Sequence, residues 1–208
     1  MGSEMCIRDR LEIGEPSPNK LPGVVYSDNG LTISSNGRCS STFDRPPNLE
    51  RLDMQKYAHA GFGVGILTKL GGFYYPTQSQ NIEESDTLWR IIRPIEEVVN
   101  EVIHMRSEYD LKKVFFIDNC FNAPLQHAKD LCRSLIDAHV SLRWNTCLGP
   151  FGCDTELIDL MKTSGCGLVL MTSAGGDAHD GNNLEKNNEE LLETCRMCED
   201  RGLKYSIS

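Results

Sequence analysis

The chain has 208 residues, of which 39% are hydrophobic and 25% are charged, with a formal net charge of −9, a composition that suits a globular protein with a domain-sized core. The negative charge argues against nucleic-acid binding, which needs Lys and Arg to neutralise phosphates, and no apolar run approaches the roughly 20 residues that span a bilayer. Since no positively charged leader precedes an apolar stretch, we expect a cytoplasmic protein with no membrane span and no nucleic-acid partner.

The first segments of the chain precede the predicted barrel. Residues 1–10 read MGSEMCIRDR, which looks like a translated sequencing-adapter read from a metagenomic gene fragment, so we expect a non-native leader there. Residues 11–62 show little helical periodicity and are predicted to form a connector. Within them, short apolar runs flank Asp28-Asn29-Gly30, a pattern typical of a β-hairpin.

From residue 63 to residue 208, strand and helix patterns alternate. The predicted strands are 63–69, 113–118, 141–148, 167–172 and 204–207, and the helices between them are 94–109, 124–139, a helix from Asp154 to Gly165, and 187–201. Asp154 is a suitable N-cap, and Gly165 and Gly202 follow helix ends. Continuously apolar strands indicate a parallel sheet covered on both faces. This repetition predicts an α/β fold, but it does not distinguish an open doubly wound sheet from a barrel.

In both architectures, functional groups gather at the carboxyl ends of the strands. The loops in question are 68–79, 118–122, 145–150 and 172–177, all rich in small and polar residues. Asp118 stands directly at a strand end. Its carboxylate is suited to a ligand's hydroxyl or ammonium group, or to capping a turn through its own backbone, and the pattern leaves both interpretations open.

An ordered series of short motifs runs through the chain. They are LPGVVY at 21–26, TKLG at 68–71, VVNE at 98–101, FIDNCFNAP at 116–124, LRW at 142–144, DTELIDLMK at 154–162, SGC at 164–166, LEKN at 184–187 and RGL at 201–203. In this order the motifs resemble the radical SAM enzymes that follow a cobalamin-binding domain. The resemblance covers about residues 22–208 and implies a partial parallel β/α barrel over residues 63–208, incomplete after about five strands.

The same resemblance exposes a departure in the first loop. In the family, a strand ending in Thr-Lys-Arg-Gly runs into CxxxCxxC, whose thiolates hold a [4Fe–4S] cluster that reductively cleaves S-adenosylmethionine for radical transformation or methylation of an organic substrate. The motif places these cysteines at Gly72, Pro76 and Ser79. Glycine and proline offer no ligand atom, and a serine hydroxyl is a poor substitute for a thiolate. We therefore expect the family's activity to be lost in this sequence.

The resemblance also implies other contacts. Asp118, Asn119 and Ser173 are predicted to lie in the S-adenosylmethionine region, although family members often have Glu where Ser173 stands. Cobalamin belongs to the N-terminal domain of the family, and an active member needs a reductant such as a ferredoxin or flavodoxin. The small-molecule substrate is not identified by the sequence.

Other interpretations remain open. The chain is alternatively a cluster-less pseudoenzyme that acts as a binding or scaffolding barrel, or its cysteines were lost through a local sequence error. Two Gly-Gly pairs favour a phosphate-binding enzyme only weakly, because no helix promptly follows Gly71-Gly72. Cys195 and Cys198 form a CxxC pair, typical of metal or redox sites, but they lie inside a predicted helix, where two semi-buried thiols are the simpler interpretation.

Overall fold

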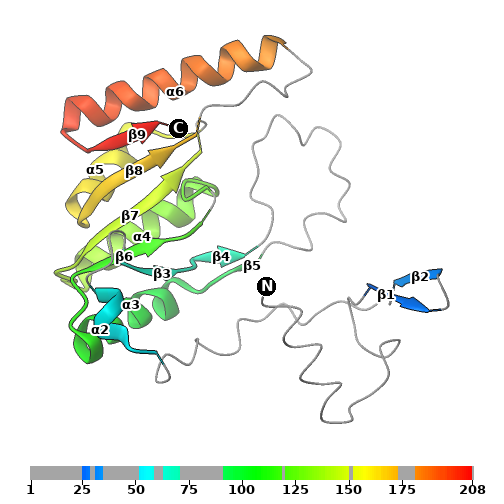
Figure 1. Cartoon of the computed structure of the whole chain (residues 1–208). Coiled ribbons are helices and arrows are strands. Elements are labelled where there is room, and N and C mark those ends of the chain that lie inside the picture. The colour runs from blue at the N-terminus through cyan, green and yellow to red at the C-terminus, as the bar shows by residue number, and fades with distance from the viewer. Residues whose placement is uncertain are drawn as a thin grey trace. The chain divides into compact units, whose positions relative to one another are not determined.

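The computed structural model describes residues 25–28, 31–34, 52–58, 63–70, 91–118, 120–149, 152–172 and 181–207 (Figure 1). The chain divides into two compact units, Met1–Phe43 and Asp44–Ser208. In the first unit, β1 (Val25–Asp28) pairs antiparallel with β2 (Leu31–Ser34). The predicted β-hairpin is therefore confirmed.

The second unit is built around one parallel sheet. Its strands are β3 (Val64–Ile66), β6 (Lys113–Phe116), β7 (Arg143–Leu148), β8 (Cys166–Met171) and β9 (Tyr205–Ile207), in that spatial order. The helices are the short α2 (Met54–Ala58) and then α3 (Ile95–Tyr109), α4 (Leu125–Asp137), α5 (Thr155–Thr163) and α6 (Gly181–Arg201). None of the described helices is both long enough and apolar enough to cross a membrane.

The strand order identifies the type of α/β fold. The five strands follow each other across the sheet in chain order, and all neighbours are parallel. Helix α3 packs on α4, α4 on α5, and α5 on α6, so consecutive helices lie side by side (Figure 1). A doubly wound sheet instead reverses its strand order and carries helices on both faces. The predicted partial β/α barrel is thus confirmed, and the open doubly wound alternative is excluded.

The main core lies between the sheet and these helices. Trp144 of β7 is 1% exposed, and its ring centroid lies 5.1 Å from that of Phe116 and 5.2 Å from that of Phe121. The indole Nε1 donates a hydrogen bond to the carbonyl oxygen of Ser164, at the end of α5, at 3.0 Å. Fully burying a large apolar side chain contributes about 1.5–3 kcal/mol. This aromatic group therefore joins the end of β6, strand β7 and helix α5.

The structure corrects the first predicted strand of the barrel. A single strand over 63–69 was expected, but β3 ends at Ile66 and a separate strand, β4 (Lys69–Leu70), pairs antiparallel with β5 (Ile91–Ile92). The prediction is wrong because the apolar run is continuous, whereas the hydrogen-bond partner of the backbone changes within it. Helix α6 also begins earlier than predicted, at Gly181.

Helix α5 has the N-cap that the sequence predicts. The Asp154 carboxylate accepts a hydrogen bond from the backbone N–H of Leu157 at 2.9 Å and forms an ion pair with the buried Lys129 at 2.5 Å. The helix ends before Gly165, whose φ of 101° favours glycine. A Cβ at Gly165 would lie 2.6 Å from the carbonyl oxygen of Leu142, so the residue also allows the close approach to β7.

We expect Asp154→Ala to lower the free energy of unfolding by about 1 kcal/mol, because an N-cap oxygen is lost. Asp154→Asn keeps a capping oxygen and removes the charge, so its loss should be smaller. Urea unfolding followed by far-ultraviolet circular dichroism measures both variants. Equal losses in the two variants would show that the charge, rather than the cap, is the stabilising feature.

Candidate functional site

The carboxyl ends of β3 and β6 are joined by a buried carboxylate. Asp118, two residues beyond β6, is 3% exposed. Its Oδ1 accepts a hydrogen bond from the backbone N–H of Thr68 at 3.0 Å, and its Oδ2 accepts one from the Thr68 hydroxyl. Turn capping through the local backbone, one interpretation that the sequence left open, is not what the structure shows. Asp118 instead binds the residues that lead into the segment 71–90.

The third donor to Asp118 is a buried ammonium group. The Lys69 Nζ lies 3.3 Å from Asp118 Oδ2 and donates a hydrogen bond to the carbonyl oxygen of Phe121 at 2.9 Å. Burial lowers the pKa of Lys69, while the neighbouring Asp118 carboxylate opposes that shift. Both side chains are almost fully excluded from solvent. Removing one member of such a pair leaves an uncompensated buried charge, so the contact strongly fixes the end of β3 against the end of β6.

A second buried ion pair, between Arg93 and Glu101, also fixes the residues that follow β3. Arg93 Nη1 donates hydrogen bonds to Glu101 Oε2 and to the carbonyl oxygen of Leu67, both at 2.7 Å. The Arg93 backbone N–H donates to the carbonyl oxygen of Thr68 at 3.0 Å. Together with the β4–β5 pairing, these contacts bring both ends of segment 71–90 together and attach them to helix α3.

The ends of β6 and β7 are connected by an amide. Asn122 Oδ1 accepts a hydrogen bond from the backbone N–H of Gly149 at 2.8 Å, and its Nδ2 donates to the Gly149 carbonyl at 3.2 Å. The backbone N–H of Phe121 donates to the Cys147 carbonyl at 2.9 Å. Asn122 lies in one of the candidate loops, 118–122, but the sequence did not predict this role for it. An asparagine beside a strand end was the available signal, since such side chains readily bond backbone groups.

Of the predicted site residues, only Asp118 lies among the residues that the structure describes. Asp118 lies at the edge of the sheet, as expected, whereas Asn119 and Ser173 lie outside the described residues. The family's cluster positions, Gly72, Pro76 and Ser79, lie outside them too. Both carboxylate oxygens of Asp118 accept hydrogen bonds from the chain.

None of the described cysteines forms a disulfide with another described residue, and most are shielded from solvent. Cys195 and Cys198 are 5% and 0% exposed, and burial raises the pKa of Cys198 to about 11. A thiol with a raised pKa is a poor nucleophile and a poor metal ligand. Within the part of the chain that the structure describes, no three His, Cys, Asp or Glu side chains are grouped in a way that could hold a metal ion.

The side chains at the three positions of the family motif do not suit a [4Fe–4S] cluster. Such a cluster needs thiolate ligands, and the three positions that the family motif assigns are Gly72, Pro76 and Ser79. Burial also raises the pKa values of Cys120 and Cys147, which lie near strand ends, so neither is a ready substitute.

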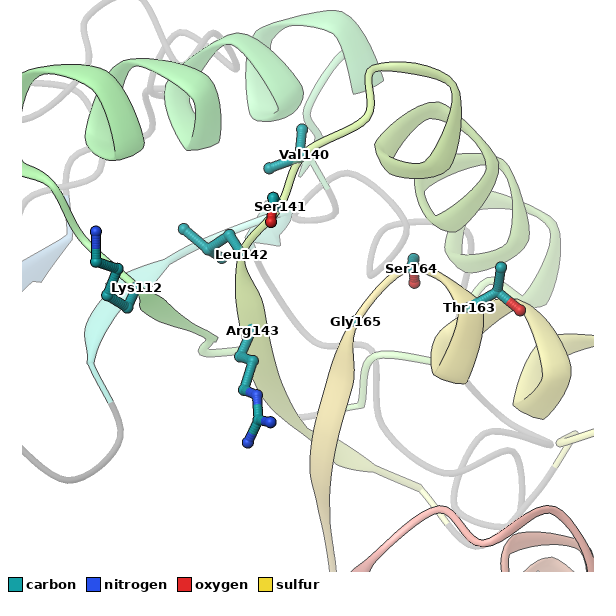
Figure 2. A pocket seen from close by; sticks show the side chains of 8 residues that line it. All are labelled: Lys112, Val140, Ser141, Leu142, Arg143, Thr163, Ser164 and Gly165. Carbon is teal, nitrogen blue, oxygen red and sulfur yellow. The ribbon is translucent and has the colours of Figure 1, made fainter.

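One described pocket lies at the opposite edge of the sheet. It has a volume of about 400 Å³ and is lined at the amino ends of β7 and β8 by residues that include Lys112, Arg143 and Ser164 (Figure 2). The Ser164 hydroxyl donates its hydrogen to the carbonyl oxygen of Met161 at 3.0 Å. Catalytic groups of parallel β/α folds gather at the carboxyl ends of the strands, so this pocket is not the candidate active site.

We expect Asp118→Asn to lower the free energy of unfolding by about 3–5 kcal/mol, because the buried Lys69 ammonium loses its counter-charge. The double variant Lys69→Met/Asp118→Leu should recover a large part of that loss, since it removes both charges. Urea unfolding of Lys69→Met, of Asp118→Leu and of the double variant gives the coupling free energy. Additive losses would contradict a direct interaction between the two side chains.

A curated protein is similar in sequence to part of this chain. No family model matches the chain. The chain is 33% identical over 86 residues to cytidylyl-2-hydroxyethylphosphonate methyltransferase of Streptomyces wedmorensis, a match that covers 40% of this chain and 16% of the relative. The chain thus spans a small part of the curated relative that it matches.

Solved structures resemble a larger part of the chain. TsrM from Kitasatospora setae is a radical S-adenosylmethionine methyltransferase. Its structure with cobalamin and a [4Fe–4S] cluster has a TM-score of 0.65 at 19% identity, and the match covers 97% of this chain and 43% of TsrM. Its structure with tryptophan and a SAM analogue has a TM-score of 0.70 at 21% identity, and the match covers 42% of TsrM.

A further similar structure is OxsB, a cobalamin-dependent S-adenosylmethionine radical enzyme. The TM-score is 0.65 at 12% identity, and the match covers 97% of this chain and 31% of OxsB. The cofactors that the motifs imply, S-adenosylmethionine, [4Fe–4S] and cobalamin, are those named for these structures, where the first is present as an analogue. The resemblance predicted from the ordered motifs is confirmed: the chain has the fold of the cobalamin-dependent radical SAM enzymes.

Proposed function

We propose that the chain is the barrel core of a radical SAM-type protein that, with this sequence, does not assemble a [4Fe–4S] cluster and does not carry out radical chemistry. One observation carries the proposal: Gly72, Pro76 and Ser79 occupy the positions of the three cluster thiolates. None provides a thiolate, so an electron cannot be delivered to S-adenosylmethionine through the family's route.

Buried ion pairs near these positions support the proposal that the fold is kept although the cluster is not assembled. The residues on either side of segment 71–90 still form two buried ion pairs, Lys69–Asp118 and Arg93–Glu101. These contacts are independent of a cluster, so the barrel end can persist when the ligands are replaced. A form of the protein with cysteines at the three positions would carry methylation or another radical transformation of an organic substrate, using a ferredoxin- or flavodoxin-type reductant.

Anaerobic reconstitution with iron and sulfide tests the proposal. We expect the present sequence to retain no stoichiometric iron and no paramagnetic signal after reduction. The matched control is the triple variant Gly72→Cys/Pro76→Cys/Ser79→Cys, which restores the motif and should bind about four irons per chain. A reduced-cluster spectrum from the unaltered sequence would overturn the proposal. Resequencing the encoding DNA provides a second check, because cysteine codons at these positions would restore the enzyme.

The alternative role is a cluster-less binding or scaffolding barrel, which the intact ion pairs at the strand ends favour. Calorimetry with S-adenosylmethionine separates this role from simple loss of function. We expect weak or undetectable binding by the unaltered sequence, because the unique iron of the cluster is the family's main anchor for that cofactor. Binding should tighten in the reconstituted triple variant. Tight binding without iron would contradict this expectation and would favour a binding role for the barrel.

A further inference from the structure

The pocket at the amino ends of β7 and β8 is separate from the candidate active site. It has a volume of about 400 Å³ and lies within the second unit of the chain (Figure 2). Small-molecule sites commonly have volumes of about 300–1,000 Å³. Three segments line the pocket: residue 112 before β6, residues 140–143 at the start of β7, and residues 163–165 between α5 and β8. Segments from different parts of the chain thus meet around one hollow.

Two side chains of the β7 wall offer hydrogen-bond donors to this pocket. Exposed and buried side chains alternate over residues 141–144, so Ser141 and Arg143 project away from the core that contains Leu142 and Trp144. Neither the Ser141 hydroxyl nor the Arg143 guanidinium forms a hydrogen bond or an ion pair with another described residue. A guanidinium and a hydroxyl on the same side of one segment can donate to a single anion.

A second cation lines the same pocket. The Arg143 backbone N–H donates to the Lys112 carbonyl oxygen at 3.0 Å, so the two residues are neighbours. The Lys112 ammonium pairs with Asp110, but both side chains are largely exposed, and such ion pairs contribute little to stability. Asp110 also pairs with Arg106 Nη1, at 3.3 Å, so its charge remains compensated when Lys112 turns to a ligand. None of the described residues that line the pocket is acidic, so its charge favours an anion.

The α5 side of the pocket offers an acceptor instead. Thr163, at the end of α5, is exposed and lines the pocket (Figure 2). Its hydroxyl donates its hydrogen to the carbonyl oxygen of Asp159 at 2.8 Å. A hydroxyl has one hydrogen and two lone pairs, so the Thr163 oxygen can still accept a hydrogen bond from a ligand. The pocket therefore has donors on one wall and an acceptor on another.

We propose that this pocket binds a small phosphomonoester that carries hydroxyl groups, of the sugar phosphate class. The phosphate accepts two parallel hydrogen bonds from the Arg143 guanidinium and one from the Ser141 hydroxyl, and Lys112 adds a second positive charge. A phosphate group suits these donors because it has three terminal acceptor oxygens. A hydroxyl of the ligand donates to Thr163. The pocket lies at the strand ends opposite Asp118, and the proposal does not depend on the cluster positions.

Calorimetric titration of the whole chain, without added iron, tests this site with glucose 6-phosphate, glucose and inorganic phosphate. We expect glucose 6-phosphate to bind roughly tenfold or more tightly than glucose, through the charge-assisted phosphate contact. It should also bind several-fold more tightly than inorganic phosphate, because only the sugar phosphate donates to Thr163. Since the cations are exposed, raising the salt concentration should weaken the binding of both phosphate ligands.

Three variants examine the contacts with the ligand. Arg143→Gln should remove most of the advantage of glucose 6-phosphate over glucose. Arg196→Gln is the matched control and should preserve that advantage, because Arg196 is exposed on α6 and does not line the pocket. Ser141→Ala should weaken both phosphate ligands. Thr163→Val should weaken glucose 6-phosphate but leave the affinity for inorganic phosphate unchanged.

Thermal unfolding establishes that each variant is folded. Three results would each overturn the proposal. They are an absence of saturable glucose 6-phosphate binding at millimolar concentration, equal effects of the two arginine variants, and equal affinities for inorganic phosphate and glucose 6-phosphate. Since no iron is used, these failures would leave the cluster proposal unaffected.

Discussion

The buried contact between Lys69 and Asp118 determines how the chain leaves the first strand of the barrel. It joins two residues that follow β3 and β6, and neither side chain has appreciable access to water. A buried charge is stable only beside an opposite charge and with its other polar atoms hydrogen-bonded. The Thr68 backbone and hydroxyl supply these bonds to Asp118, and the Phe121 carbonyl receives one from Lys69.

The contacts that stabilise the candidate site do not involve the positions of the cluster motif. Lys69 and Arg93 are held through contacts to Asp118, Glu101 and backbone carbonyls. These partners lie in helix α3 or in the residues that directly follow β3 and β6. The cluster motif would lie in segment 71–90, which begins and ends at these contacts. Because these contacts form without metal ligands, substitutions at the cluster positions need not disturb the fold. A family-like barrel and an absent thiolate motif are therefore compatible in one chain.

The two faces of the sheet differ in how completely their side chains are buried. The helix-facing side is packed around Trp144 and Phe116, with side chains excluded from water. The opposite side bears the half-buried Phe115 and Leu168, with Asn145 between them. Close packing provides stability on the first face, whereas side chains on the second face are less completely buried. This division is the one expected when helices cover only the outside of a curved parallel sheet.

The sequence by itself determined the features that depend on neighbouring residues. Helices α3, α4 and α5 follow from apolar periodicity, Asp154 from the N-cap position, and Gly165 from a helix end that favours positive φ. Each of these signals is local, because helix hydrogen bonds span four residues. The ordered motifs added the fold family, since their spacing reflects the repeated strand–helix unit.

Only the tertiary structure decided which distant groups meet. Asp118 binds Thr68, fifty residues away in the chain, and the short β4–β5 pairing joins Lys69 to Ile92. The choice between a barrel and a doubly wound sheet also required the spatial order of the strands. The bulge beside Asn145 is of the same kind, because an extra residue on β8 is defined only by its pairing with β7. Strand register and buried ion pairs are set by contacts between segments, and a linear pattern carries no direct record of them.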